Sequence, residues 1–120
     1  MKHIKQYLTE ALHNITHDIK NCVFRTNGGE LCYFDSPITV PFDGEALEIQ
    51  TLVVSNKRQG IGTQLVNACI EYAKSIGKDI ILCASPLDNS ISEKDLINFY
   101  KKLGFKQING MNKSFLIYSI

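Results

Sequence analysis

The sequence predicts a single α/β domain in which a sheet carries helices on both faces. Three observations predict it: an Asn-Gly hairpin signal at Asn27, a glycine-rich turn that leads from a strand into an amphipathic helix at residues 63–76, and an apolar strand at 79–84. Because that last strand lacks polar alternation, we expect it to be covered on both sides. At 120 residues the chain is large enough for one core and too small for two.

The first element is predicted to be a helix over residues 1–20 that packs on the sheet. Apolar residues recur there at helical spacing, at Ile4, Leu8, Ala11, Leu12, Ile15 and Ile19. Glu10, His13 and His17 share another face of this helix. Two histidines four residues apart can bind a metal, but no third ligand is evident, so a solvated polar face is the favoured interpretation.

Short strands follow on either side of a tight turn. Residues 21–26 and 30–35 are predicted to pair across Asn27-Gly28-Gly29, because Asn-Gly is a strong hairpin signal. Residues 47–54 form the next predicted strand, which leads into the glycine-rich turn.

The two remaining helices have recognisable ends. The helix at 63–76 ends at Gly77, a residue suited to a left-handed C-terminal cap. Ser92, with Asp95 three residues later, resembles a capping box and predicts the start of a helix that Gly104 ends.

The last elements are two strands around 105–108 and 113–120, joined across Asn109-Gly110. No repeat or linker interrupts this order, so the whole chain is predicted to form one domain.

Charge and hydropathy exclude several classes of protein. With a formal net charge of +1 and no basic stripe, direct nucleic-acid binding is not expected. No apolar run has the length of a membrane span, and the N-terminus has no secretory apolar block. We therefore expect a cytoplasmic location and no membrane partner.

The four cysteines, Cys22, Cys32, Cys69 and Cys83, are interpreted as small buried apolar residues within predicted strands or a helix. They contain no Cys-x-x-Cys pair, so neither a zinc site nor a disulfide framework is implied, and no metal is expected. Cys83 could act as a nucleophile that carries an acyl group, but core packing is the favoured interpretation.

The most informative segment is 57–63, Lys-Arg-Gln-Gly-Ile-Gly-Thr, between a predicted strand and a predicted helix. The N–H groups of such a turn can converge on phosphate oxygens, and the helix dipole adds partial positive charge. The spacing fits neither a P-loop nor a dinucleotide fingerprint, because Leu65 is large and neither Ala84 nor Ser85 is acidic. The ligand type that remains is a single pyrophosphate with a long organic tail, as in acyl-coenzyme A.

Two segments resemble motifs of the GCN5-related N-acetyltransferase (GNAT) family. Residues 57–62 resemble motif A, in which Arg or Gln is followed by two residues, Gly, one residue, and Gly or Ala; here Lys57 occupies the first position. Residues 96–105, Leu-Ile-Asn-Phe-Tyr-Lys-Lys-Leu-Gly-Phe, resemble motif B. The resemblance implies a GNAT-like mixed, mostly antiparallel twisted sheet and transfer of an acetyl group from acetyl-CoA to an amine.

The resemblance also implies site residues. Tyr100 would be the general acid for the departing thiolate, against the alternative of a core tyrosine beside Phe99. Glu48, which we expect to share a strand face with Gln50, Leu52 and Val54, is a candidate base; the alternative is a surface carboxylate paired with a lysine. The implied cofactor-binding residues are Leu52, Val53, Val54, Lys57, Arg58, Gln59, Gly60, Ile61, Gly62 and Thr63.

The acceptor side is expected to be abbreviated and open. Full-length members of the family carry two helices between the first two strands, whereas only the turn at 27–29 is available here. An open groove suits a protein side chain or terminus better than a small amine, so we hypothesise a macromolecular acceptor.

Residues 57–65 and 84–100 are also similar to a very short phage-encoded family member, an anti-CRISPR acetyltransferase. An acetyltransferase of the anti-CRISPR or toxin type with one dedicated target, a non-catalytic CoA-binding module and a homodimer are therefore alternatives that stay open.

Overall fold

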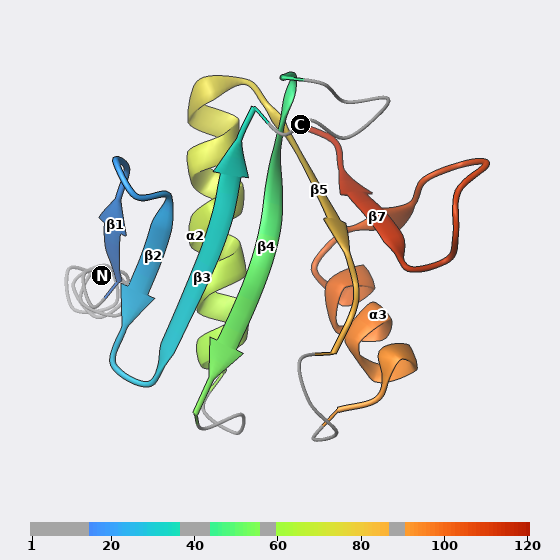
Figure 1. The fold of residues 1–120 in the computed structure, drawn as a ribbon, viewed down its shortest axis with the longest axis horizontal. Helices are drawn as coiled ribbons and strands as arrows, with labels where there is room; N and C mark the ends of the chain where they lie inside the picture. Colours follow the sequence, from blue (N-terminus) through green and yellow to red (C-terminus); the bar gives the residue numbers. More distant parts are fainter. Residues whose placement is uncertain (1–14, 37–43, 56–59, 87–90) are drawn as a thin grey trace, which may run out of the picture.

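The computed structural model describes residues 15–36, 44–55, 60–86 and 91–120. Within them a twisted sheet has the strand order β1-β2-β3-β4-β5-β7-β6, and two helices pack against it (Figure 1). The strands are β1 Thr16–Asp18, β2 Val23–Thr26, β3 Gly29–Asp35, β4 Ala46–Val54, β5 Asp79–Cys83, β6 Lys106–Gln107 and β7 Phe115–Tyr118, and the helices are α2 Ile61–Ile76 and α3 Glu93–Lys102. Of the neighbouring strand pairs, β4 and β5 run parallel and the others antiparallel, which confirms the predicted mixed fold.

The local signals for turns and helix ends are confirmed. Thr26 pairs with Gly29, so Asn27-Gly28 closes the hairpin between β2 and β3. Gly77 caps α2 at a φ of 69°, in the left-handed region where glycine is favoured. The Ser92 hydroxyl accepts a hydrogen bond from the backbone N–H of Asp95 at 3.1 Å, as expected for an N-cap.

Both described helices pack on one face of the sheet, called here the helix face. Helix α2 lies behind β3 and β4 in Figure 1 and buries an apolar stripe that includes Leu65, Val66 and Cys69. Helix α3 adds Ile97 and Tyr100 to the same hydrophobic cluster. Residues 1–14, which hold most of the predicted first helix, lie outside the described part of the chain. The opposite side of the sheet is called here the open face.

The strand β4 carries a bulge that separates residues expected to share a face. Cys32 pairs with Thr51 and Tyr33 pairs with Ile49, so the pairing skips Gln50. An extra residue shifts the alternation of side chains along the rest of a strand. Glu48 therefore lies on the open face, whereas Leu52 and Val54 pack against the core on the helix face. The prediction that Glu48 shares a face with Leu52 and Val54 is wrong for this reason.

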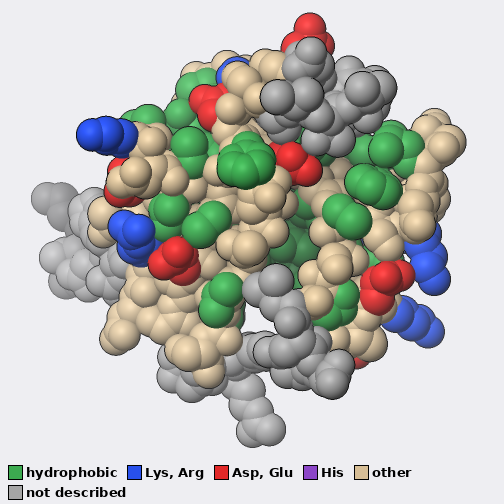
Figure 2. Space-filling view, viewed as in Figure 1, with side chains coloured by type: hydrophobic (Ala, Val, Ile, Leu, Met, Phe, Trp, Pro, Cys, Tyr) green, Lys and Arg blue, Asp and Glu red, His purple; other side chains and the backbone are tan. Residues whose placement is uncertain are grey.

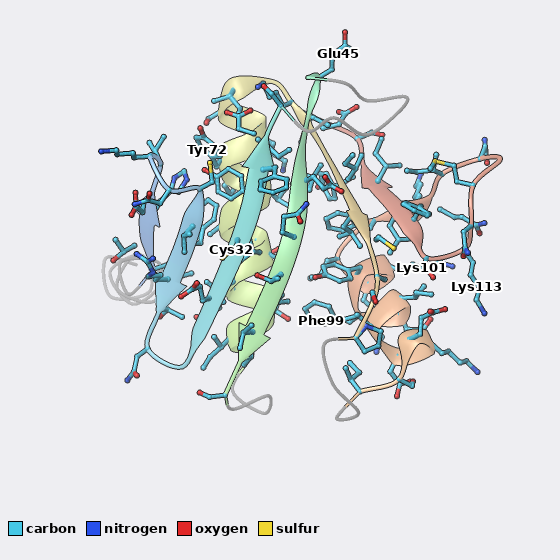
Figure 3. The ribbon with its side chains drawn as sticks, viewed as in Figure 1. Cys32, Glu45, Tyr72, Phe99, Lys101 and Lys113 are labelled. Carbon is cyan, nitrogen blue, oxygen red and sulfur yellow. The ribbon has the colours of Figure 1, made fainter. Side chains whose placement is uncertain are left out.

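The end of the predicted N-terminal helix is a strand instead. In β1, His17 lies opposite Phe24 and stacks on its ring with centroids 4.0 Å apart. The His17 Nε2 atom lies 2.6 Å from the Tyr33 hydroxyl, and the ring of Tyr72 from α2 meets His17 edge-on at 4.4 Å (Figure 3). A helix through residue 20 and a solvated His17 are therefore wrong predictions. Ile15 and His17 both pack inwards, which is the period of a strand.

The described ranges bear on the metal and membrane expectations. No group of three or more metal-ligating side chains gathers there. No helix in this part of the chain is long and apolar enough to cross a membrane.

Candidate active site

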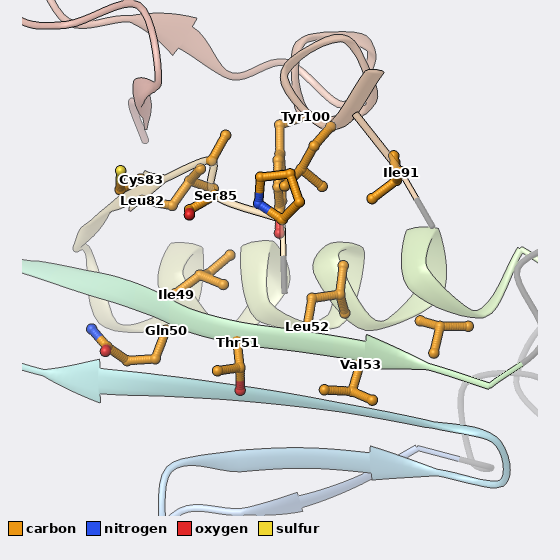
Figure 4. A pocket seen from close by; sticks show the side chains of 14 residues that line it. Ile49, Gln50, Thr51, Leu52, Val53, Leu82, Cys83, Ser85, Ile91 and Tyr100 are labelled. Atoms are coloured by element: carbon orange, nitrogen blue, oxygen red, sulfur yellow. The ribbon is translucent and has the colours of Figure 1, made fainter. Parts of the chain in front are cut away.

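The candidate site forms where β4 and β5 stop pairing. The two strands pair only from Ala46 to Ile49 and from Asp79 to Leu82, and then diverge. The gap holds a cavity of about 120 Å³, called here the wedge cavity (Figure 4). Its lining residues come from the ends of both strands and from α3: Ile49, Gln50, Thr51, Leu52, Val53, Val54, Leu82, Cys83, Ala84, Ser85, Pro86, Ile91, Leu96 and Tyr100.

Tyr100 projects from α3 into the wedge cavity toward β4 (Figure 4). Its ring meets those of Phe99 and Phe105 at centroid distances of 5.1 and 5.4 Å, and the residue is 4% exposed. Burial raises the pKa of the phenol, so Tyr100 is protonated at neutral pH. Among the described residues its hydroxyl has no hydrogen-bond partner. A proton donor is thus held rigidly at the cavity by its packing in the core.

A second cavity of about 240 Å³ continues from the first toward the start of α2. Leu52, Val54, Ile91 and Leu96 line both cavities. Gly60, Gly62, Thr63 and Phe99 complete the second lining, and Phe99 projects from α3 toward the gap (Figure 3). A continuous path therefore runs along β4 from the first turn of α2 to Tyr100.

The first turn of α2 offers backbone N–H groups at one end of this path. Gly60 is the N-cap at a φ of 68°, no side chain caps the helix, and the first turn holds no acidic residue. The N–H groups at such a helix start have no partner within the helix, and the dipole favours an anion there. Lys57, Arg58 and Gln59, which we predicted to contribute donors, lie outside the described residues.

The space in front of this turn is open. A Cβ built on Gly60 would meet no atom of the described residues within 4 Å, and one on Gly62 would meet Phe99 Cζ at 3.5 Å and Val54 Cγ2 at 3.6 Å. The glycines therefore leave room for a ligand to approach the main chain, as the sequence suggested.

The described site groups Tyr100 with most of the predicted cofactor-binding residues but sets Glu48 apart. Leu52, Val53 and Val54 line the wedge cavity, and Gly60, Gly62 and Thr63 line the second one. Ile61 is 8% exposed and packs into the core. Glu48 lies on the open face, and its negative charge raises the pKa of the Cys83 thiol.

Cys83 is the main surprise at the site. It is exposed and lines the wedge cavity, so the interpretation as a buried core residue is wrong. The reason is that after Leu82 β5 loses β4 as a neighbour, although Cys83 still pairs with Phe115 of β7. Partial burial and the negative charges of Glu93 and Glu48 raise the pKa of its thiol, which keeps it protonated and disfavours a nucleophilic role. Cys22 and Cys32 are also partly exposed, and Cys69 is buried as predicted.

Other lining residues were not singled out from the sequence. Gln50 is the extra residue of the bulge and Thr51 follows it, and Ser85 and Pro86 follow the end of β5. A usable signal existed for the second pair, because ligands often bind beyond the carboxyl ends of parallel strands at a point where they diverge. The bulge left no comparable pattern in the residue types.

A family model described as an acetyltransferase (GNAT) domain matches residues 22–107, which is more than half of the chain. The chain belongs to the GNAT acetyltransferases. This confirms the resemblance carried by the turn at 57–62 and the helix at 96–105. The path along β4 is accordingly the candidate donor site of a GNAT domain.

Curated and structural relatives agree with this family. An uncharacterised N-acetyltransferase of Methanocaldococcus jannaschii is 40% identical over 65 residues, which are 52% of this chain and 27% of that protein. The GNAT chain described here thus spans about a quarter of that relative's length. The crystal structure of the anti-CRISPR protein AcrVA5 is 33% identical, covers 79% of this chain and 94% of its own, and gives a TM-score of 0.68.

More distant structures share the fold. The structure of AtaTR bound with acetyl-CoA is 20% identical, covers 80% of this chain and 64% of its own, and has a TM-score of 0.52. AtaT complexed with acetyl-methionyl-tRNAfMet is 19% identical, covers 99% and 82% of the two chains, and has a TM-score of 0.51. At these identities the likeness shows the GNAT fold alone.

Proposed function

We propose that this GNAT domain transfers an acetyl group from acetyl-CoA to an amine on a protein, either a lysine or a chain terminus. The observation that carries the proposal is the continuous path along β4, with helix N–H groups at one end and the Tyr100 hydroxyl at the other. Because one end of the path attracts an anion and the other offers a proton donor, the path suits a ligand with an anionic end and a reactive end. The AtaTR structure bound with acetyl-CoA supports the same donor on this fold.

The donor would be held by main chain more than by side chains. The N–H groups of Gly60 to Thr63, with the basic and amide residues Lys57, Arg58 and Gln59 before them, would bind the diphosphate. Beyond Ile49, no strand of the described residues pairs with β4 on the β5 side. The backbone of Leu52, Val53 and Val54 is therefore free on that side to pair with the amide groups of an extended pantetheine arm, like an added strand.

The reaction needs an amine without its proton and a proton for the departing thiolate. Acetyl-CoA supplies an activated acyl group as a thioester. Tyr100 is the proposed donor of the second proton, because its hydroxyl lines the wedge cavity and burial keeps it protonated. A lysine amine has a reference pKa of about 10.4, so a base or a water relay must take its proton. We assign this task to Glu48, acting across the gap near Cys83.

Two measurements test the donor site and the reaction separately. Titration calorimetry with CoA should show binding, and thiol release from acetyl-CoA in the presence of amine acceptors should show turnover. If CoA gives neither heat nor a shift in melting temperature at millimolar concentration, the proposed function is wrong. If CoA binds but no amine accepts the acetyl group, the domain is a CoA-binding module without activity.

A narrower candidate is acetylation of one dedicated target, as in an anti-CRISPR or toxin-type protein. The observation that favours it is the match to AcrVA5, which this chain covers over 94% of that protein's length at 33% identity. Lysates incubated with this protein and labelled acetyl-CoA would separate the two readings by mass spectrometry. A single strongly labelled protein supports the dedicated target, and many weakly labelled ones exclude it.

A further inference from the structure

Among the described residues, only the packing of rings sets the direction of the Tyr100 hydroxyl. The hydroxyl has no hydrogen-bond partner in this part of the chain, although the residue is only 4% exposed. A group that transfers a proton must be held in place, because a misplacement of about 1 Å can cost about a hundredfold in rate. The rings that touch Tyr100, from Phe99 and Phe105, therefore decide where its hydroxyl lies in the wedge cavity.

The turn that ends α3 brings Phe105 back onto Tyr100. The Phe105 N–H donates to the Tyr100 carbonyl at 3.2 Å, and the Gly104 N–H donates to the Lys101 carbonyl at 3.1 Å. Gly104 has a φ of 108°, in the region that favours glycine. These bonds form a Schellman motif, in which the apolar residue after the glycine packs against the last turn of the helix. The ring of Phe105 is accordingly buried and meets the Tyr100 ring at 69°.

Tyr118 of β7 covers this turn. Its side chain points to the helix face and packs on the core, whereas that of Ile117 points to the open face, where Figure 2 shows hydrophobic side chains over β7. The Tyr118 ring meets the Phe105 ring with centroids 5.4 Å apart. A Cβ built on Gly104 would lie 2.8 Å from Tyr118 Cε2, a distance at which side-chain atoms clash. The Tyr118 ring is thus packed directly against the backbone of the turn.

We propose that Tyr118 is a positioning residue, which holds Phe105 against Tyr100 and so fixes the Tyr100 hydroxyl in the wedge cavity. The three rings form a continuous row, with both centroid distances at 5.4 Å. Tyr118 lines neither the wedge cavity nor the second cavity, so it acts through packing alone. It also lies beyond residues 22–107, which the family model matches. The proposal deepens the proposed function and rests on it, because it takes Tyr100 to be the proton donor.

Steady-state kinetics of two variants test this role. Tyr118→Leu keeps an apolar side chain but removes the ring that touches Phe105. We expect its kcat to fall at least about fivefold while the KM for acetyl-CoA changes by less than about twofold. Tyr118→Phe keeps the ring and loses only a hydroxyl that bonds to no described residue, so it should restore most of the lost kcat.

Tyr72→Leu is the matched control. Tyr72 is also partly buried against the core, but its ring meets Phe24 and Tyr33 at the far edge of the sheet. Both leucine variants should lower the free energy of unfolding, whereas only Tyr118→Leu should lower kcat. If Tyr118→Leu does not fold, Tyr118→Met takes its place, because methionine adapts to irregular space in a core.

NMR of the Tyr100 ring gives a readout that does not depend on turnover. A ring packed tightly by its neighbours flips slowly, and loss of a packing partner speeds up the flips. With ring-labelled tyrosine, and with Tyr100→Phe to assign the signal, we expect flips at least about tenfold faster in Tyr118→Leu than in the wild type. Tyr72→Leu should leave the flip rate of Tyr100 unchanged.

Several outcomes would overturn the positioning role of Tyr118. These are an unchanged kcat or an unchanged Tyr100 flip rate in Tyr118→Leu, an equal fall of kcat in Tyr72→Leu, and an equal fall in Tyr118→Phe, which would assign the effect to the hydroxyl. They leave the proposed function standing. Absence of CoA binding overturns the proposed function itself, and the flip rate still reports whether Tyr118 holds Tyr100 in place.

Discussion

The two halves of β4 have different surroundings. From Leu47 to Ile49 the strand is paired on both sides, and Leu47 is fully buried. From Gln50 to Val54 it keeps β3 as a neighbour but loses β5, and every residue lines the wedge cavity. One strand thus serves as core in its first half and as a binding edge in its second. The comparison teaches that this site opens where β4 loses its neighbour β5.

The largest expected effect is a loss of stability from a substitution in the first half of β4. Leu47→Ala should lower the free energy of unfolding by about 3 kcal/mol, because it removes a fully buried side chain and leaves a cavity. Leu52→Ala, in the second half, should cost less stability but weaken CoA binding, because Leu52 is only partly buried and lines both cavities. Urea unfolding and CoA titration of both variants measure this. If the two variants lose stability equally, the two halves do not differ as described.

Tyr100→Phe tests the reactive end of the path. The ring contacts with Phe99 and Phe105 stay, so the fold and the affinity for acetyl-CoA should be kept. Turnover should fall by about tenfold to a thousandfold, the usual range for loss of a general acid. Steady-state thiol release gives kcat, and calorimetry gives the dissociation constant of acetyl-CoA. An unchanged kcat would remove Tyr100 from the mechanism and leave it as a core residue.

Gly60→Asp tests the anion end. A Cβ at Gly60 meets no atom of the described residues within 4 Å, and Asp and Asn tolerate positive φ better than most residues, so the variant should fold. The carboxylate would stand where we place the diphosphate, and we expect at least about tenfold weaker CoA binding. Gly60→Asn has nearly the same shape without the charge, so the difference between the two variants isolates electrostatic repulsion. Similar affinities in both would mean that bulk alone is responsible.

The features that could be predicted from the sequence are those that short local segments determine. Local signals were sufficient where one residue type decides the backbone, as at Gly77, Ser92 and the Asn27-Gly28 turn. They also singled out Gly60, Gly62 and Tyr100, which line the two cavities, because these residues lie in short motifs. They failed where pairing between distant strands decides the outcome. The bulge at Gln50 depends on how β4 pairs with β3, and the exposure of Cys83 depends on where β5 and β4 stop pairing. Neither feature produces a recognisable pattern of residue types.

The helix prediction for the N-terminal edge of the sheet failed for a related reason. Apolar residues up to Ile19 fit a helical period, yet Ile15 and His17 pack inwards together and Ile19 is 62% exposed. In a hydropathy pattern a histidine counts as a polar residue. Here its ring stacks on Phe24 and hydrogen-bonds to Tyr33, so it behaves as part of the core. Its cross-strand partners, rather than its neighbours in the chain, decide which way it points.

This partly buried histidine yields the smallest expected effect, a dependence of stability on pH. Burial lowers the pKa of His17 below its ordinary value of 6.5, and the nearby Asp18 carboxylate partly opposes the shift. The folded protein therefore binds this proton less readily than the unfolded chain. The contribution of His17 to the free energy of unfolding is complete above pH 6.5 and is lost as the pH falls through the lowered pKa of His17 in the folded state.

Urea unfolding at pH 7 and at successively lower values down to about pH 5 would measure this effect. The wild type should lose more unfolding free energy over that range than His17→Asn, which cannot titrate. Asp18→Asn should lose more than the wild type, because it removes the charge that raises the His17 pKa. Parallel curves for the wild type and His17→Asn would mean that His17 keeps an ordinary pKa in the fold. The aromatic cluster at this edge would then be open to water, in contrast to the dry core around the first half of β4.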